Sequence, residues 1–188
     1  IVVNDGLGGG VASVKQCGDE PFLMAQKLPT TPIVVGSNKR AAIEVAIQAF
    51  QPKIIILDDA FQSHYIDRTI DIVLFNCLEK EKNFHLFPTG SLREPPRALL
   101  RSQLVIFTKH NLLTTKLLPA PSQKIVQLLK YHKIPFLFSN YTSSYKEYCL
   151  ETHSFKLKKY DNKNQSPILA MSGIGDSKSF DILCNQYF

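Results

Sequence analysis

The stretch IIILDDAFQSH, residues 54–64, sets an aliphatic run directly against two adjacent acids. Residues 53–57 have the composition of a short strand that is covered on both faces, as strands of parallel sheets are. Ligands of open α/β sheets bind beyond the carboxyl ends of the strands, the position expected for Asp58 and Asp59. Neighbouring carboxylates repel each other unless a cation is present, so the pair favours a magnesium site over the alternative that one Asp caps a turn and the other is solvated.

Further aliphatic runs of the same kind recur along the chain and are separated by segments with helical spacing of apolar residues. The runs predict strands over 33–35, 53–57, 71–75, 104–107, 135–138 and 168–171. The helical segments are 20–28, 39–50 and 122–131, with Ser122 as the N-cap of the last. Strands that alternate with helices predict an α/β fold, a doubly wound and mostly parallel sheet.

The succession of strands and helices becomes irregular between residues 141 and 166. Apolar and polar residues alternate over 147–160, which indicates a solvent-facing hairpin. We therefore expect a core domain over 1–140, a linker with a hairpin over 141–166, and the start of a second, smaller α/β domain over 167–188. The chain opens inside a strand-like run and stops inside a helix-like one, so we expect it to be an internal piece of a longer protein.

Composition narrows the functional classes. The formal charge of +6 suits an acidic partner, but Lys and Arg are scattered, which argues against a nucleic-acid arm. The four cysteines stand far apart without a C-x-x-C pair, so neither a zinc site nor a disulfide framework is expected, and the five histidines show no metal-ligand spacing. No apolar run is long enough to cross a bilayer, and there is no signal-peptide pattern.

Three other clusters contain candidate functional residues. Gly18-Asp19-Glu20-Pro21 precedes a helical segment, where acids also serve as caps. Leu92-Arg93-Glu94-Pro95-Pro96 reads as a rigid loop in which Arg93 clamps a phosphate, unless it only pairs with Glu94. Ser172 to Asp176 is either a tight turn or an anion-binding helix start. The glycines of residues 6–10 favour a flexible loop over a dinucleotide site because no amphipathic helix follows them.

Taken together, these segments resemble the tetraacyldisaccharide 4′-kinase family, the lipid A 4′-kinases. GDEPFLMAQKLP (18–29) resembles the family's GDEP helix start, and NKRAAIEVAIQAF (38–50) its arginine-bearing helix. ILDDAFQSHYIDRTIDIVL (56–74) resembles the DDGFQH region and the strand after it. LFPTGSLREP (86–95) resembles the LREP loop, and MSGIG (171–175) the SGIG turn. The order and spacing match as well as the motifs.

The resemblance implies a P-loop kinase that transfers the γ-phosphoryl group of ATP to the 4′-hydroxyl of a lipid A disaccharide precursor, with Mg²⁺, at the cytoplasmic face of the bacterial inner membrane. It makes Asp19 the catalytic base and Asp58 the metal ligand. Asp59 would be the second catalytic acid of the pair. The resemblance also implies that Gln62, Arg93 and Glu94 contact the nucleotide or substrate.

The chain departs from the family pattern at several points. Ala60 and Ser63 stand where the DDGFQH motif has Gly and His, and residues 4–8 read NDGLG where relatives carry SRGYG. The resemblance places the G-x-x-x-x-G-K-[ST] loop before Ile1 and a histidine partner of the catalytic Asp after Phe188. We therefore expect residues 1–188 alone to be inactive. Two alternatives stay open: a soluble P-loop ATPase or small-molecule kinase, and a degenerate homologue that binds nucleotide or lipid without chemistry.

Overall fold

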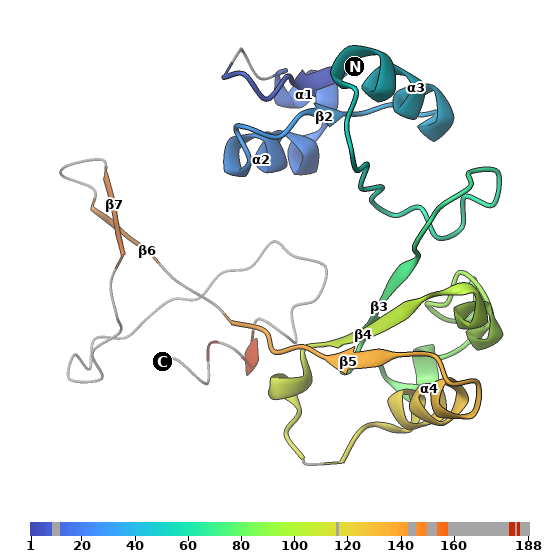
Figure 1. Ribbon diagram of the computed structural model, residues 1–188. Helices are drawn as coiled ribbons and strands as arrows, with labels where there is room; N and C mark the ends of the chain where they lie inside the picture. Colours follow the sequence, from blue (N-terminus) through green and yellow to red (C-terminus); the bar gives the residue numbers. More distant parts are fainter. Residues whose placement is uncertain are drawn as a thin grey trace. The chain divides into compact units, whose positions relative to one another are not determined.

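The structure, a computed structural model, describes residues 1–8, 12–115, 117–142, 146–149, 154–157, 181, 182 and 184, and of 146–149 and 154–157 only the backbone. The chain divides into two compact units, Ile1–Asp67 and Arg68–Phe188, each described here by itself (Figure 1). The expected strand over 168–171 and the turn from Ser172 to Asp176 lie outside the described residues. The expected division into 1–140, 141–166 and 167–188 stays a prediction.

The first unit is a small α/β layer. Its elements are β1 (Val2–Asn4), α1 (Val14–Cys17), α2 (Asp19–Lys27), β2 (Ile33–Val34) and α3 (Lys39–Phe50). β1 and β2 pair antiparallel, so the prediction that residues 33–35 join a parallel sheet is wrong. A short turn of helix, α1, contributes Cys17 to a core shared with Val3 and Ala25.

A buried asparagine ties this unit together. Asn4 is 2% exposed, and its amide nitrogen donates to the carbonyl oxygens of Leu28, Pro29 and Thr31, each at 3.2 Å. Its side-chain oxygen accepts from the Gly6 amide at 3.0 Å. A buried side-chain amide is tolerated only when its donors and acceptors are satisfied. The departure from the family pattern at position 4 therefore has a structural role: Asn4 fixes the α2–β2 connection against β1.

Helix α3 confirms the prediction at both ends. Asn38 caps it, with its side-chain oxygen accepting from the Ala41 amide at 3.2 Å, and Gln51 ends it in the left-handed region with φ 46°. An Asn N-cap satisfies one of the amides that the first helical turn leaves unpaired. Lys39 is consequently held in the first turn of the helix.

The predicted strand over residues 53–57 is wrong. These residues are all described, and no strand forms there; Ile54 and Ile56 are 79% and 90% exposed. An aliphatic run predicts that a segment can occupy a buried sheet, but a strand exists only where a neighbouring strand pairs with it. Asp58 and Asp59 therefore lie on a turn that follows a segment without regular secondary structure, and they do not follow a strand.

The second unit contains a parallel sheet of three strands: β3 (Ile72–Asn76), β4 (Leu104–Thr108) and β5 (Phe136–Phe138), in the order β3-β4-β5. Val105 pairs with both Val73 and Phe136, which sets the register. The strands are connected through η1 (Glu81–Asn83), η2 (Pro96–Arg101), η3 (His110–Leu112) and α4 (Ala120–Tyr131). The predicted strands over 71–75, 104–107 and 135–138 are confirmed, and so is their parallel arrangement. β6 (Lys146–Cys149) and β7 (Ser154–Leu157) pair antiparallel within the segment expected to hold a hairpin.

The core of this unit lies between the sheet and α4, which runs alongside β4 and β5 (Figure 1). Ile125 and Leu129 of α4 pack with Val105 and Phe107 of β4, all at most 1% exposed. Side chains alternate between the faces of a strand, so Ile72 and Leu74 belong to the opposite face, where they are 55% and 66% exposed. Within the described residues of this unit, the core covers one face of the sheet, so the expected double winding stays a prediction.

The predicted cap of α4 is also wrong. The helix begins at Ala120 with Pro119 as its N-cap, and Ser122 lies inside the first turn, fully buried. The Ser122 hydroxyl donates to the carbonyl oxygen of Cys77 at 3.4 Å. Proline at the start of a helix needs no amide partner, so the helix begins two residues earlier than a Ser-cap pattern indicates.

Candidate active site

The acid pair lies on a sequence of tight turns that are held by their own backbone. The Ser63 amide donates to the Ala60 carbonyl at 2.9 Å, and the Ile66 amide to the Ser63 carbonyl at 3.1 Å. Ala60 and Ser63 are buried at 6% and 8% exposure, whereas Asp58, Asp59 and Gln62 are exposed. The turns therefore direct the small side chains inward and leave the three candidate polar residues accessible to a ligand.

The replacement of the family's glycine by Ala60 is accommodated by this turn. The residue with left-handed backbone is Asp59, with φ 47°, and Ala60 is not among the residues with positive φ. Aspartate and asparagine adopt this conformation more readily than most residues with a side chain, because their short polar side chains bond locally. Alanine at position 60 thus carries no backbone strain, and it fills a buried site.

A lysine that the sequence did not single out reaches this segment. The Nζ of Lys39, in the first turn of α3, donates to the carbonyl oxygen of Asp58 at 2.8 Å. This contact brings a positive charge to the segment that carries the two carboxylates, so part of their repulsion is offset without a metal. Lys39 lies 19 residues before Asp58, and the only signal of it in the sequence was its place directly after the cap residue Asn38.

The carboxylates of Asp58 and Asp59 suit a magnesium ion whose remaining ligands are water and phosphate oxygens. Within the residues that the structure describes, no three His, Cys, Asp or Glu side chains gather into a metal site. Magnesium is usually held by one or two carboxylates together with phosphate oxygens and water, and not by a closed protein cage. An exposed acid pair on a turn fits that pattern.

Asp19 opens helix α2. Its Oδ1 accepts from the Glu20 amide at 3.0 Å, and the residue is exposed. The preceding Gly18 has φ 90°, a conformation that a residue with a side chain adopts only under strain, and it sets the direction in which the helix leaves α1. The remaining carboxylate oxygen of Asp19 has lone pairs with which to accept a proton, as a general base must.

Backbone hydrogen bonds within the LREP loop of the second unit hold it together. The Phe87 amide donates to the Leu92 carbonyl at 2.8 Å, and the Leu92 amide to the His85 carbonyl at 3.0 Å. Gly90 is enclosed: a Cβ at this position would lie 2.3 Å from the His85 carbonyl oxygen. The backbone of the loop consequently leaves no space for a side chain at position 90.

Glu94 forms an ion pair with an arginine outside the loop. Nη1 and Nη2 of Arg101, at the end of η2, donate to the two carboxylate oxygens of Glu94 at 2.9 and 3.2 Å. The carboxylate is partly buried and thereby oriented, while Arg93 is exposed. A carboxylate held by a bidentate arginine is a positioned acceptor. Arg101 is thus a supporting residue that sequence reasoning missed.

The structure brings some of the six candidate residues together. Asp58, Asp59 and Gln62 share one set of turns, and Asp19 lies in α2 of the same unit. Arg93 and Glu94 belong to the second unit. Their assignment to catalysis, metal or substrate remains a proposal.

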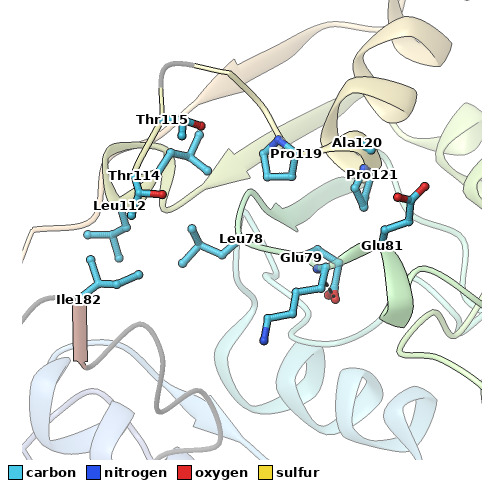
Figure 2. A pocket seen from close by; sticks show the side chains of 12 residues that line it. Leu78, Glu79, Glu81, Leu112, Thr114, Thr115, Pro119, Ala120, Pro121 and Ile182 are labelled. Atoms are coloured by element: carbon cyan, nitrogen blue, oxygen red, sulfur yellow. Dashed lines mark hydrogen bonds between the residues drawn. The ribbon is translucent and has the colours of Figure 1, made fainter.

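The second unit also contains a cavity of about 340 Å³ that the sequence did not reveal (Figure 2). It lies where the chain leaves β3, beside η3 and the start of α4. Its lining comes from three described stretches and one residue near the end of the chain: 78–81, 112–115, 119–121 and Ile182.

Comparison with known proteins decides the family. The family model described as tetraacyldisaccharide-1-P 4′-kinase matches residues 2–184. The chain belongs to this kinase family. The resemblance inferred from the GDEP, DDAFQ and LREP segments is thereby confirmed, and all six candidate residues fall inside the matched range.

Individual relatives of the kinase family agree. A tetraacyldisaccharide 4′-kinase of Halothermothrix orenii is 31% identical over 188 residues, which is 95% of this chain and 47% of that protein. The protein of the same name from Aquifex aeolicus is 27% identical over 89% of this chain and 47% of its own length. One from Desulfatibacillum aliphaticivorans is 42% identical over half of this chain, 26% of its own length.

The chain thus spans about half the length of the kinase relatives that match most of it. No solved structure matches it. Among the described residues, no helix is both long and apolar enough to cross a membrane.

Proposed function

We propose that the complete protein transfers the γ-phosphoryl group of ATP to the 4′-hydroxyl of a tetraacyldisaccharide 1-phosphate in lipid A biosynthesis. The observation that supports this most strongly is the family match across residues 2–184. The acid pair supports it independently, because it stands exposed on a fixed turn with a lysine bonded to the same segment. The P-loop type of the fold and its double winding are part of the same proposal.

The chemistry assigns one task to each candidate side chain. Asp19 accepts the proton of the 4′-hydroxyl as its oxygen attacks the γ-phosphorus, and ADP leaves with the electrons of the broken P–O bond. Asp58, supported by Asp59, would hold Mg²⁺, which neutralises charge on the phosphates. Phosphoryl transfer depends chiefly on in-line positioning and charge neutralisation, so exact placement matters more here than a shifted pKa.

Gln62, Arg93 and Glu94 would position the reactants. Gln62 is exposed on the turn that follows the acid pair and has an amide that both donates and accepts. Arg93 has the planar fork that binds phosphate oxygens bidentately. Glu94, oriented by Arg101, is suited to accept hydrogen bonds from substrate hydroxyls.

We place the reaction at the cytoplasmic face of the bacterial inner membrane, as the resemblance to the kinase family implies. The charge of the chain is unevenly divided. Residues 1–67 contain five Lys or Arg residues and seven Asp or Glu residues. Residues 68–188 contain seventeen Lys or Arg residues and nine Asp or Glu residues, so the second unit is the basic one. A basic unit is attracted to an anionic lipid surface by roughly 1 kcal/mol for each basic residue that lies close to it.

The test is a phosphotransfer assay on the complete protein with radiolabelled ATP. Three acceptors are compared: the tetraacyldisaccharide 1-phosphate, the same disaccharide without acyl groups, and water. The proposal expects the label on the lipid, dependent on Mg²⁺, with much slower release of free phosphate. Phosphate release at the same rate with and without lipid would instead identify an ATPase. Binding of ATP without any turnover would identify a non-catalytic homologue.

A further inference from the structure

The loop between η1 and η2 in the second unit has an exposed apolar tip, formed by Leu86 and Phe87. These side chains are 47% and 79% exposed, and Pro88 and Thr89 beside them are exposed as well. Within the described part of the chain, neither apolar side chain packs into the hydrophobic core. Single exposed apolar side chains are common on protein surfaces, so what distinguishes this tip is how it is held and what surrounds it.

The loop holds the tip away from the core. Phe84, at the base of the loop, packs edge-on against Phe75, with 6.2 Å between the ring centroids. Beyond this anchor, the amides of Thr89 and Gly90 both donate to the Leu86 carbonyl oxygen, at 3.0 and 3.1 Å. These turns fix the backbone on both sides of the tip. The tip therefore cannot fold back onto the core without breaking hydrogen bonds of the loop.

The tip lies beside residues that are proposed to meet the lipid substrate. The Phe87 amide donates to the Leu92 carbonyl oxygen at 2.8 Å, so Phe87 lies opposite the residue that precedes Arg93 and Glu94. A membrane lipid that is bound by its headgroup keeps its acyl chains in the bilayer. An apolar tip beside a headgroup-binding arginine is suited to that position at the bilayer surface.

The charge around the tip is positive. Residues 79–101 contain five Lys or Arg residues and three Glu residues. Two of these acids are paired, Glu81 with Lys124 at 3.0 Å and Glu94 with Arg101 at 2.9 Å. Three exposed cations of this stretch make no ion pair with a carboxylate of a described residue: Lys80, Lys82 and Arg97. Cations around an apolar tip suit a partner that is both apolar and anionic, as an anionic bilayer is.

We infer that the tip of Leu86 and Phe87 inserts into the surface of an anionic lipid bilayer and holds the kinase beside its lipid substrate. The inference rests on the proposed function and names the surface with which the second unit meets the membrane. The two apolar side chains enter the boundary between headgroups and acyl chains, and the cations of residues 80–97 meet the headgroup phosphates. Two side chains supply a weak and reversible attachment.

Vesicles of phosphatidylglycerol and phosphatidylethanolamine, without substrate, test this in the complete protein. Cosedimentation measures how strongly each variant binds them. We expect Phe87→Ser to weaken binding at least tenfold, because an inserted ring leaves water. Tyr131→Ser is the matched control, since Tyr131 is an aromatic residue of α4 with 83% exposure, and it should stay within twofold of the wild type. Lys82→Gln should weaken binding about fivefold on these vesicles and have no effect on neutral phosphatidylcholine vesicles.

Fluorescence shows whether the tip itself enters the bilayer. Residues 1–188 contain no tryptophan, so Phe87→Trp adds a probe whose signal is the difference from the wild type. The added indole should emit as in water without vesicles, shift to shorter wavelength on the anionic vesicles, and be quenched by brominated lipid. Tyr131→Trp should show neither change. Emission from Phe87→Trp that is already shifted before vesicles are added would mean that the rest of the protein or a second copy covers the tip, which overturns the inference.

Kinetics separates this inference from the proposed function. With the lipid substrate in vesicles, Phe87→Ser should need at least tenfold more bulk lipid for its half-maximal rate. If Phe87→Ser binds substrate-free vesicles normally but needs more lipid substrate, the tip contacts the acyl chains of the substrate and the inference is wrong. If the wild type phosphorylates the lipid and no tip variant differs from it, the proposed function stands and the inference is wrong. If the tip binds vesicles but the wild type does not phosphorylate the lipid, the membrane surface stands and the proposed acceptor is wrong.

Discussion

The side chain of Lys39 donates a hydrogen bond of 2.8 Å to the main-chain oxygen of Asp58. The contact joins the capped start of α3 to the segment that carries the acid pair. It therefore gives the turn a long-range anchor in addition to its own backbone hydrogen bonds. It also places a cation on the segment proposed to bind Mg²⁺, where a positive charge opposes metal binding and relieves carboxylate repulsion at the same time.

Replacement of Lys39 should consequently alter magnesium affinity in a defined direction. Lys39→Met removes the charge, so the acid pair should bind Mg²⁺ a few-fold more tightly, although loss of the anchor lowers turnover. Lys39→Arg keeps the charge and should leave the metal affinity near that of the wild type. Calorimetric titration of the complete protein with Mg²⁺ measures the magnesium affinity of the wild type and of both variants. Equal magnesium affinity in all three proteins would show that the metal is bound elsewhere.

Asp19 is the proposed base, so Asp19→Asn should separate binding from chemistry. Asparagine retains the shape and can still accept from the Glu20 amide, but it cannot accept the hydroxyl proton. We expect the dissociation constant for ATP to stay within twofold and kcat to fall by about 10²–10⁴, the usual contribution of general base catalysis. The matched control is Glu20→Gln, which removes the neighbouring exposed charge and should leave kcat nearly unchanged. Undiminished kcat in Asp19→Asn would remove this residue from the base role.

The Glu94–Arg101 pair should be measurable as a coupling energy. The pair is bidentate but partly exposed, with side-chain exposures of 19% and 37%, so we expect about 1 kcal/mol of coupling between Glu94→Gln and Arg101→Gln in urea unfolding. Because Arg101 orients the carboxylate, Arg101→Gln should also lower turnover in the same direction as Glu94→Gln. Independent effects of the two substitutions on stability and on turnover would contradict the positioning role.

The LREP loop should depend on the absence of a side chain at position 90. In Gly90→Ala the new Cβ meets the carbonyl oxygens of His85 and Asn83 at 2.3 and 2.5 Å, and backbone atoms cannot move aside cheaply. We expect a loss of about 1–3 kcal/mol in the free energy of unfolding, as for other overpacked sites. Turnover should fall too, since the loop carries Arg93 and Glu94. Gly36→Ala is the control, because its Cβ would lie 3.4 Å from the nearest atom, the Ala42 Cβ. A Gly90→Ala protein as stable as this control would refute the steric argument.

Local patterns in the sequence predicted the elements that local interactions determine. Helix α3 begins and ends where the spacing of its apolar residues indicates, and β3 and β4 follow from their aliphatic runs. The run at 53–57 has the same composition, yet it is not a strand. The difference lies in whether a neighbouring strand pairs with it, and no local pattern contains that information.

In the candidate site, too, local sequence predicted some features, whereas those that depend on distant contacts were missed. The motifs singled out Asp58, Gln62 and Glu94 as candidates, since short signatures contain these polar residues, but they placed Asp58 at the end of a strand that does not form. Lys39 and Arg101 escaped notice because their partners lie 19 and 7 residues away in the sequence. The cavity escaped for a similar reason, since its lining comes from four separate stretches.

Cys77 gives the second unit a specific sensitivity to alkaline pH. Burial raises the pKa of its thiol from 9.0 to about 11, because a thiolate is poorly solvated in the core. The folded state therefore holds a proton that the unfolded state loses above pH 9, so this contribution to stability is complete below pH 9 and is lost as the pH rises towards 11. Urea unfolding measures the free energy of unfolding at pH 8 and at pH 10.5. Between these two pH values, the wild type should lose up to about 2 kcal/mol more of this free energy than Cys77→Ala, which has no thiol to titrate. Other titrating groups contribute equally to both proteins, so equal losses would mean that the Cys77 thiol ionises in the folded protein as readily as in the unfolded chain.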